Sequence, residues 1–290
     1  MSIDLDFENL SVRAVEYNAR ASVKDFDGCM VEYAELAREA KLKTPGIYDL
    51  HYGMAAAERL DLFPTPIQPA PLLIFIHGGY WHSQRKEEAC SMAAAFSQNG
   101  VAVATLEYTL APEATLSEIV HEVRSAVAWL YHNGEKFGID PERIFVSGSS
   151  AGGHLCGMLI PDDWQLRYRL PSNAIKGVLA LSGLYDLRPL CETYINEWLN
   201  LSLVQAKKLS PIFSLPGKAY APQILLSVGA LETLGFKNQT EAYYQACCAQ
   251  GLDVKLLEDH KSNHFTLVNN LADPQSEMFQ SAMAMINSFR

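Results

Sequence analysis

The chain has 290 residues, of which 49% are apolar and 19% are charged, as is typical of a soluble globular protein with a sizeable core. Its formal net charge of −10 argues against a nucleic acid or an anionic membrane surface as partner. The acidic start, MSIDLDFENL, predicts no signal peptide, and no apolar run approaches the ~18 residues of a transmembrane helix. The six cysteines follow no disulfide-framework spacing, so we expect free thiols in a reducing cytoplasm.

The N-terminal part of the chain precedes the central sheet. Residues 7–45 have a polar, amphipathic pattern that predicts a helical arm, which we count as residues 1–45. Residues 46–53 and 58–63 are short alternating segments around an alanine-rich turn, and they predict a hairpin. Four prolines within residues 64–71 then predict a stiff connector into the first central strand.

Beyond this connector, short apolar segments alternate with helical patterns. The alternation predicts an α/β fold in a single domain of residues 1–290, with a mostly parallel, doubly wound sheet and helices on both faces. Residues 187–215 break the rhythm, and we expect them to form a small helical cap insertion over the strand ends, where ligands of open α/β sheets bind. The predicted strands are 72–78, 101–108, 143–149, 177–183, 223–230 and 254–259, and the predicted helices include 84–99, 116–138, 150–160 and 275–289.

The stretch SGSSAGGH contains the pattern Gly-x-Ser-x-Gly, with Ser150 at its centre between Gly148 and Gly152. A nucleophile on a tight strand-to-helix turn needs small residues on both sides, because larger ones would block the chain. RIFVSGS predicts the strand before the turn, and SAGGHLCGML predicts the helix after it. We therefore predict that Ser150 is a nucleophile; the alternative is a turn whose small residues serve packing alone.

A second loop, HGGYW, directly follows the apolar segment LLIFI. Glycines at the end of a strand can direct backbone N–H groups toward an oxyanion. We predict an oxyanion hole formed by the N–H groups of Gly79, Tyr80 and Ala151. Tyr80 and Trp81 are expected to line the substrate pocket, together with Phe265.

The order serine, acid, histidine along the chain is typical of enzymes with this elbow. Glu232 and His264 both follow predicted strands and fall on the same edge of the sheet as Ser150. We predict His264 as the general base and Glu232 as the acid that orients its imidazole. The competing histidine is His260, which fits a turn, and the competing acids are Asp186, Asp253, Glu258 and Asp259.

Two further histidines lie close to these motifs. We expect His77 to orient the HGGYW loop rather than to react, and His154, one helical turn after Ser150, to be a packed scaffold residue. No His/Cys/Asp/Glu set has the spacing of metal ligands, so we predict no metal. GSSAGG is neither a dinucleotide fingerprint nor a phosphate-binding loop with its lysine, so we expect no cofactor.

The segments HGGYW, GSSAGGHL, LSGLYDLRPL, VGALETLGFKNQ and NHF occur in this order and resemble the α/β-hydrolase kynurenine formamidases (arylformamidases) and their bacterial esterase relatives. EYNARASV near the N-terminus is also similar to that group, and the resemblance covers residues 15–270. It implies the α/β-hydrolase fold, with the family's nucleophile, acid and base at Ser150, Glu232 and His264; the family acid is often aspartate. It also implies hydrolysis of N-formyl-L-kynurenine to kynurenine and formate without a cofactor.

The leading prediction is a cytoplasmic serine hydrolase that cleaves a small acyl amide or ester through an acyl-enzyme, as arylformamidases do. The alternative enzyme is a carboxylesterase or amidase for another small acyl substrate, because fold and triad do not fix the substrate. A non-catalytic binding protein with a hydrolase fold is the alternative from another class. The expected partner is a small-molecule acyl substrate; the sequence allows a homodimer without specifying one.

Overall fold

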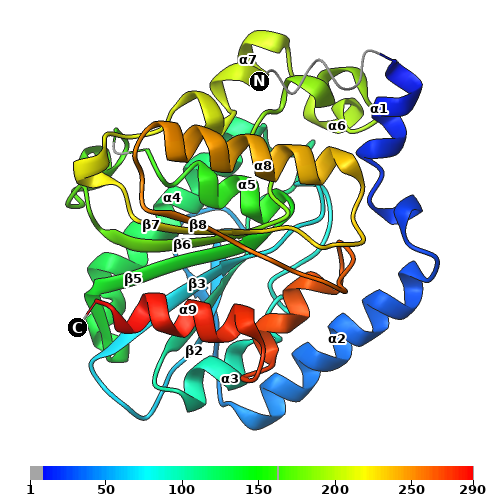
Figure 1. Ribbon diagram of the computed structural model, residues 1–290. Coiled ribbons are helices and arrows are strands. Elements are labelled where there is room, and N and C mark those ends of the chain that lie inside the picture. The colour runs from blue at the N-terminus through cyan, green and yellow to red at the C-terminus, as the bar shows by residue number, and fades with distance from the viewer. Residues whose placement is uncertain (1–8, 162, 290) are drawn as a thin grey trace.

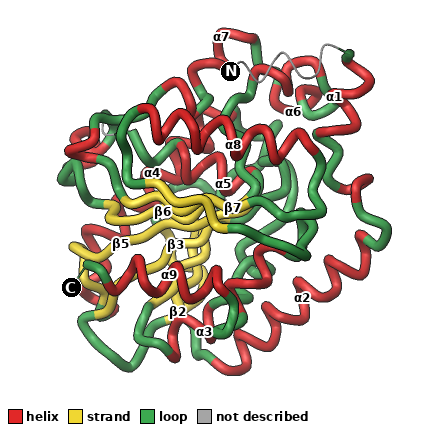
Figure 2. The backbone as a smooth tube through the Cα atoms, in the orientation of Figure 1, coloured by secondary structure: helices red, strands yellow, loops and turns green. Residues whose placement is uncertain are grey.

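A twisted sheet runs through the middle of the molecule, between two layers of helices (Figures 1 and 2). The computed structural model describes residues 9–161 and 163–289, so the start of the predicted arm, residues 1–8, lies outside the described residues. Within the described part, the sheet has eight strands in the order β1-β2-β4-β3-β5-β6-β7-β8. The strands are β1 Ile47–His51, β2 Arg59–Phe63, β3 Ala70–Ile76, β4 Ala102–Leu106, β5 Ile139–Ser149, β6 Ile175–Leu181, β7 Gln223–Ser227 and β8 Val254–Leu257.

The pairing confirms the predicted hairpin and the mostly parallel sheet. β1 pairs antiparallel with β2, and β2 pairs antiparallel with β4, whereas all pairs from β4 to β8 are parallel. Because parallel neighbours end at the same edge, the loops after β3, β5, β7 and β8 meet there, at the edge where ligands of open α/β sheets bind.

The apolar strands serve two cores at once, as β3 illustrates. Leu72, Ile74 and Ile76 pack into a core with helices α4, α5 and α8, whereas Leu73 and Phe75 pack into a second core with α2, α3 and α9. Both faces of the strand are buried, which explains its uninterrupted apolar sequence. The helices are α1 Leu10–Glu16, α2 Phe26–Lys43, α3 Ala93–Gln98, α4 Leu116–Asn133, α5 Ala151–Gly157, α6 Asn196–Leu199, α7 Leu203–Lys208, α8 Leu234–Ala249 and α9 Glu277–Asn287.

The helix predicted for residues 84–99 is confirmed only over α3. The preceding residues form turns instead, and two of them make polar contacts with distant segments. Gln84 has a φ of 68° and accepts a hydrogen bond from the N–H of Gly78. Lys86 is buried, and its ammonium donates to Asp61 at 2.7 Å.

The two segments outside the regular alternation lie at one end of the sheet. The arm consists of α1, a 3₁₀ turn at Arg20–Ser22 and α2, which runs along the outside of the molecule (Figure 1). Residues 187–215 contain the short helices α6 and α7, flanked by 3₁₀ turns. Arg13 of the arm forms an ion pair with Glu192 of this insertion. Among the helices of the described residues, none has both the length and the apolar character needed to cross a bilayer.

Candidate active site

Ser150 stands at the turn between β5 and α5, with φ 58° and ψ −117°. Such a conformation is unfavourable for a residue with a side chain and occurs where the surroundings impose it. The flanking glycines are required by close approach. A Cβ atom on Gly148 would lie 2.5 Å from the carbonyl oxygen of Gly152, and one on Gly152 would overlap the carbonyl oxygen of Ile76. The strand-to-helix elbow predicted from the sequence is therefore present.

His264 and Glu232, which come from the loops after β8 and β7, form a direct hydrogen bond. The His264 Nδ1 atom lies 2.6 Å from Glu232 Oε2, and both residues are buried. The other carboxylate oxygen, Oε1, accepts from the hydroxyl of Ser182 at 2.5 Å and from the N–H of Gly229 at 2.6 Å. Donors at both oxygens fix the carboxylate in the orientation that faces the imidazole.

Ser150 and His264 line one cavity of about 460 Å³. No hydrogen bond joins these two described residues, a common finding when no substrate is bound. The ring of Phe236 lies 4.2 Å from the ring of His264, and that of Phe265 lies 5.3 Å from it. These aromatic contacts, together with Glu232, restrict the position of the imidazole at the cavity wall.

The HGGYW loop turns tightly beside the elbow, and three of its residues have positive φ: Gly79, Tyr80 and Trp81. The N–H of Gly78 is occupied by Gln84 at 3.1 Å, whereas those of Gly79 and Tyr80 donate to no acceptor among the described residues. Ala151 is the first residue of α5, and the first N–H groups of a helix have no intrahelical acceptor. The three predicted oxyanion donors thus lie on the two loops that border the cavity.

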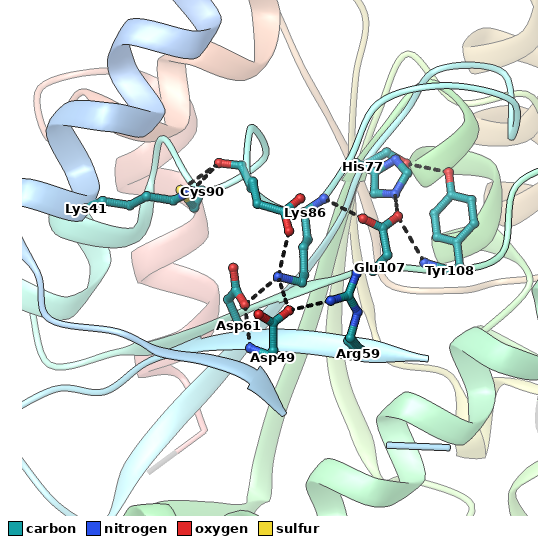
Figure 3. Close-up of polar contacts among 10 residues, drawn as sticks. Lys41, Asp49, Arg59, Asp61, His77, Lys86, Cys90, Glu107 and Tyr108 are labelled. Carbon is teal, nitrogen blue, oxygen red and sulfur yellow. Dashed lines mark hydrogen bonds and ion pairs between the residues drawn. The ribbon is translucent and has the colours of Figure 1, made fainter. Parts of the chain in front are cut away.

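His77 is buried and does not line the cavity. Figure 3 shows its side chain beside those of Glu107 and Tyr108. Its Nε2 atom is 3.3 Å from Glu107, and its ring stacks on that of Tyr108 at 4.2 Å. Its Nδ1 atom contacts the carbonyl oxygen of Gly78 at 3.0 Å. Glu107 also accepts from the backbone N–H of Lys86. These contacts fit the expected orienting role, because they tie the loop to a buried polar network.

Trp81 is a correction to the predicted pocket. It is fully buried, and its ring packs edge-on against that of His154 at 4.9 Å instead of lining the cavity. Tyr80 and Trp81 both have positive φ, but of the two only Tyr80 lines the cavity. Tyr80 and Phe265 do line the cavity, and the Tyr80 hydroxyl donates to the carbonyl oxygen of Tyr17 at 2.6 Å.

The competing acids have other partners. Asp186 binds the guanidinium of Arg188 at 2.7 Å, and Asp259 accepts from the hydroxyl of Ser262 at 2.6 Å. Each therefore braces its own loop. Among the hydrogen bonds and ion pairs of the described residues, none connects His264 to Asp186, Asp253, Glu258 or Asp259.

The remaining histidines near the site do not face Ser150. The His260 side chain is 80% exposed and lies 3.8 Å from Glu258. His154 is buried and donates from Nε2 to the carbonyl oxygen of Leu209 at 2.8 Å. Burial lowers the pKa of His154 from 6.5 to about 4, so its imidazole is neutral at physiological pH. It behaves as the packed scaffold residue expected.

The arm contributes a wall of the cavity that was not predicted from the sequence. Phe26, Met30 and Tyr33 lie on one side of α2 and face the cavity, and Phe26 packs edge-on against Phe265 at 5.0 Å. Their spacing of four and three residues could have predicted this wall, because it places the three side chains on one helix face. The other lining residues that were missed include Arg20 of the arm, Glu88, and Tyr194 and Trp198 of the insertion.

The described residues hold no group of His, Cys, Asp and Glu side chains suited to bind a metal ion. The family model described as BD-FAE matches residues 60–209, about half of the chain. The chain is 30% identical to the kynurenine formamidase of Danio rerio, over 98% of this chain and 97% of that protein. The chain belongs to the kynurenine formamidase family.

Solved structures agree with this placement in the kynurenine formamidase family. A crystal structure from Silicibacter sp. TM1040, provisionally named a thioesterase, has a TM-score of 0.80 and 28% identity over 94% of this chain and 98% of that chain. An esterase of Pyrobaculum calidifontis has a TM-score of 0.72 and 17% identity over 96% and 97%, which shows the fold alone. This family member is thus an α/β-hydrolase, a hydrolytic enzyme of the arylformamidase and esterase type.

Proposed function

We propose that this enzyme hydrolyses N-formyl-L-kynurenine to kynurenine and formate, with Ser150 as nucleophile, His264 as general base and Glu232 as orienting acid. The observation that carries the catalytic part is the 2.6 Å hydrogen bond between Glu232 and His264, at a cavity that Ser150 also lines. The substrate is supported by the near full-length similarity to a kynurenine formamidase.

The reaction follows the chemistry of serine hydrolases. His264 takes the proton of Ser150 while Oγ attacks the formyl carbon, and the tetrahedral oxyanion accepts hydrogen bonds from the N–H groups of Gly79, Tyr80 and Ala151. The intermediate collapses when the protonated imidazole gives its proton to the departing aryl amine. A water molecule, deprotonated by His264, then cleaves the formyl-enzyme and releases formate.

The matched test compares Ser150→Ala with Ser147→Ala, a buried serine of the same segment that lies outside the cavity. Ser150→Ala should lower kcat on the order of 10⁴-fold, leaving the rate that the oxyanion hole alone supports. Ser147→Ala should keep near wild-type turnover. Near-normal turnover by Ser150→Ala would refute the assignment of the nucleophile, and a wild-type enzyme that no fluorophosphonate labels at Ser150 would point to a binding protein.

A substrate panel tests the formamide assignment separately. The kcat/KM for N-formyl-L-kynurenine should exceed that for short 4-nitrophenyl esters. A preference for esters, with no measurable turnover of the formamide, would make the enzyme a carboxylesterase or amidase for another small acyl substrate. Neither outcome bears on the role of Ser150, which is tested by the Ser150→Ala and Ser147→Ala variants.

We also propose that the enzyme acts in a reducing cytoplasm on a free small molecule, without a cofactor and without a nucleic acid or membrane partner. The six free cysteines and the net charge of −10 support this proposal. A homodimer stays a prediction, which sedimentation velocity of the full chain would test.

A further inference from the structure

The arm that covers the catalytic cavity is fastened to the catalytic loops. The Tyr17 carbonyl oxygen accepts from the Tyr80 hydroxyl at 2.6 Å, and the Tyr17 hydroxyl accepts from Gln239 of α8 at 2.9 Å. Glu16 accepts from the hydroxyl of Thr233, next to Glu232 in the chain. The residues that follow Tyr17 are therefore held at a fixed position relative to Ser150 and His264.

Arg20 lies three residues beyond this anchor and lines the cavity. Its guanidinium carbon is 4.4 Å from the centre of the Phe26 ring, which restricts the side chain by a cation–π contact. In the part of the chain that the structure describes, no carboxylate forms an ion pair with Arg20, and no hydrogen bond engages its guanidinium. Its hydrogen-bond donors therefore stay free for a ligand.

The charges of the cavity wall are few. Of the described residues that line it, Arg20 is the only lysine or arginine and Glu88 is the only carboxylic acid, and the two do not pair with each other. The rest of the wall is mostly aromatic and apolar. The protein as a whole carries a net charge of −10, so its overall field does not attract a carboxylate, and Arg20 is a local exception at the cavity wall.

We propose that Arg20 is a specificity-determining residue that binds a carboxylate on the substrate, away from the bond that is cleaved. This proposal rests on the proposed hydrolytic function and adds a residue that selects among acyl substrates. A guanidinium presents two parallel N–H groups to a carboxylate, so the contact fixes the orientation of the substrate as well as its charge. The aromatic ring of such a substrate packs against Phe26 and Phe265, between Arg20 and Ser150.

The test measures kcat/KM for N-formyl-L-kynurenine and for its carboxamide, which has the same shape without the negative charge. Arg20→Gln should lower kcat/KM for the carboxylate substrate about tenfold or more, mainly through KM, and should change the value for the carboxamide less than about twofold. Arg20→Lys should restore part of the preference, because it keeps the charge without the bidentate geometry. Added salt should reduce the preference of the wild-type enzyme and leave that of Arg20→Gln unchanged.

Two variants serve as comparisons. Arg38 is an exposed arginine of α2 that does not line the cavity, so Arg38→Gln should behave as wild type on both substrates. Glu88→Gln removes the opposite charge from the same wall and should raise, not lower, kcat/KM for a substrate with a carboxylate but no amino group. Since Arg20 is exposed, its loss should leave the unfolding temperature unchanged.

Equal losses on the carboxylate and the carboxamide would overturn the proposal, because they would show that Arg20 merely supports Phe26. No loss on either substrate would overturn it as well. If the wild-type enzyme cleaves neither formamide, the proposed formamidase function fails. The role of Arg20 is then tested by kcat/KM for the esters O-acetyltyrosine, which has the carboxylate, and O-acetyltyrosinamide, which lacks it. A carboxylate preference that Arg20→Gln abolishes on this ester pair would support the proposal; the absence of one would refute it.

Discussion

Glu232→Gln is the substitution that most directly tests how the imidazole is held. It keeps the length of the side chain and replaces an acceptor oxygen by an NH₂ group. The carboxylate now receives three donors: the ring N–H of His264, the hydroxyl of Ser182 and the N–H of Gly229. A glutamine offers one oxygen, so it cannot accept from both sides at once.

The expected cost follows from the two orientations of the amide. If the amide oxygen faces Ser182 and Gly229, its NH₂ group faces His264 Nδ1 and selects the tautomer with the proton on Nε2, which cannot accept a proton from Ser150. That tautomer should lower kcat on the order of 10⁴-fold. If the oxygen faces His264 instead, NH₂ opposes the buried N–H of Gly229, and the unmatched donors cost about 1–3 kcal/mol of stability.

The assay is kcat and kcat/KM for the best acyl substrate between pH 6 and 9, together with the unfolding free energy of each variant. Glu258→Gln is the matched comparison, because it makes the same change on an exposed carboxylate near the same loop. The exposed variant should match the wild type. A folded Glu232→Gln enzyme with less than a tenfold loss in kcat and an unchanged free energy of unfolding would refute the view that this carboxylate fixes the tautomer of His264.

Two further predictions concern the elbow and the packed histidine beside it. Gly152→Ala should abolish activity and lower the unfolding temperature in circular dichroism melts, because its Cβ atom would overlap the carbonyl oxygen of Ile76. Gly217→Ala, whose Cβ atom would have nothing within 4 Å, should melt as the wild type does. His154 has a folded pKa of about 4, below its unfolded value near 6.5, so its contribution to stability is complete above pH 6.5 and decreases as the pH falls toward 4. This group alone should lower the free energy of unfolding by about 2 kcal/mol at pH 5 relative to pH 7.5. Denaturant unfolding of His154→Gln at the two pH values should show a difference that is smaller by this amount. The same difference in the variant as in the wild type would contradict the neutral, buried state of His154.

The positions of the strands along the chain could be predicted because their signal is local. Short apolar segments such as β3 are buried on both faces, and that burial is visible as an uninterrupted run of apolar residues. Glu232 and His264 could be located for a related reason. Each follows a parallel strand, and parallel strands end at one edge of the sheet, so distant segments meet there without any contact having to be known.

Residues 84–92 and Trp81 could not be predicted, because their positions depend on partners far along the chain. Lys86 can be buried because carboxylates surround its ammonium, among them Asp61 on β2 and Asp49 on β1 (Figure 3). Nothing in the local pattern around Lys86 distinguishes it from a solvated lysine on a helix. Trp81 likewise lies in the core against His154, which is 73 positions away in the sequence (154 − 81). The backbone at Tyr80 and Trp81 also has positive φ, a conformation that these residue types do not predict.

The arm shows how a segment outside the sheet can belong to the catalytic site. Its helical pattern was visible, but an amphipathic stripe reveals only that one face is buried, not what covers it. The stripe of Phe26 and Met30 faces a cavity instead of a closed core, and Phe265, the neighbour of His264, completes the contact. Sheet, elbow and acid can position a serine for attack on many acyl groups. The arm contributes part of the cavity wall, and under our proposal the rest of the substrate packs against it, which would explain why substrate choice is harder to predict than chemistry.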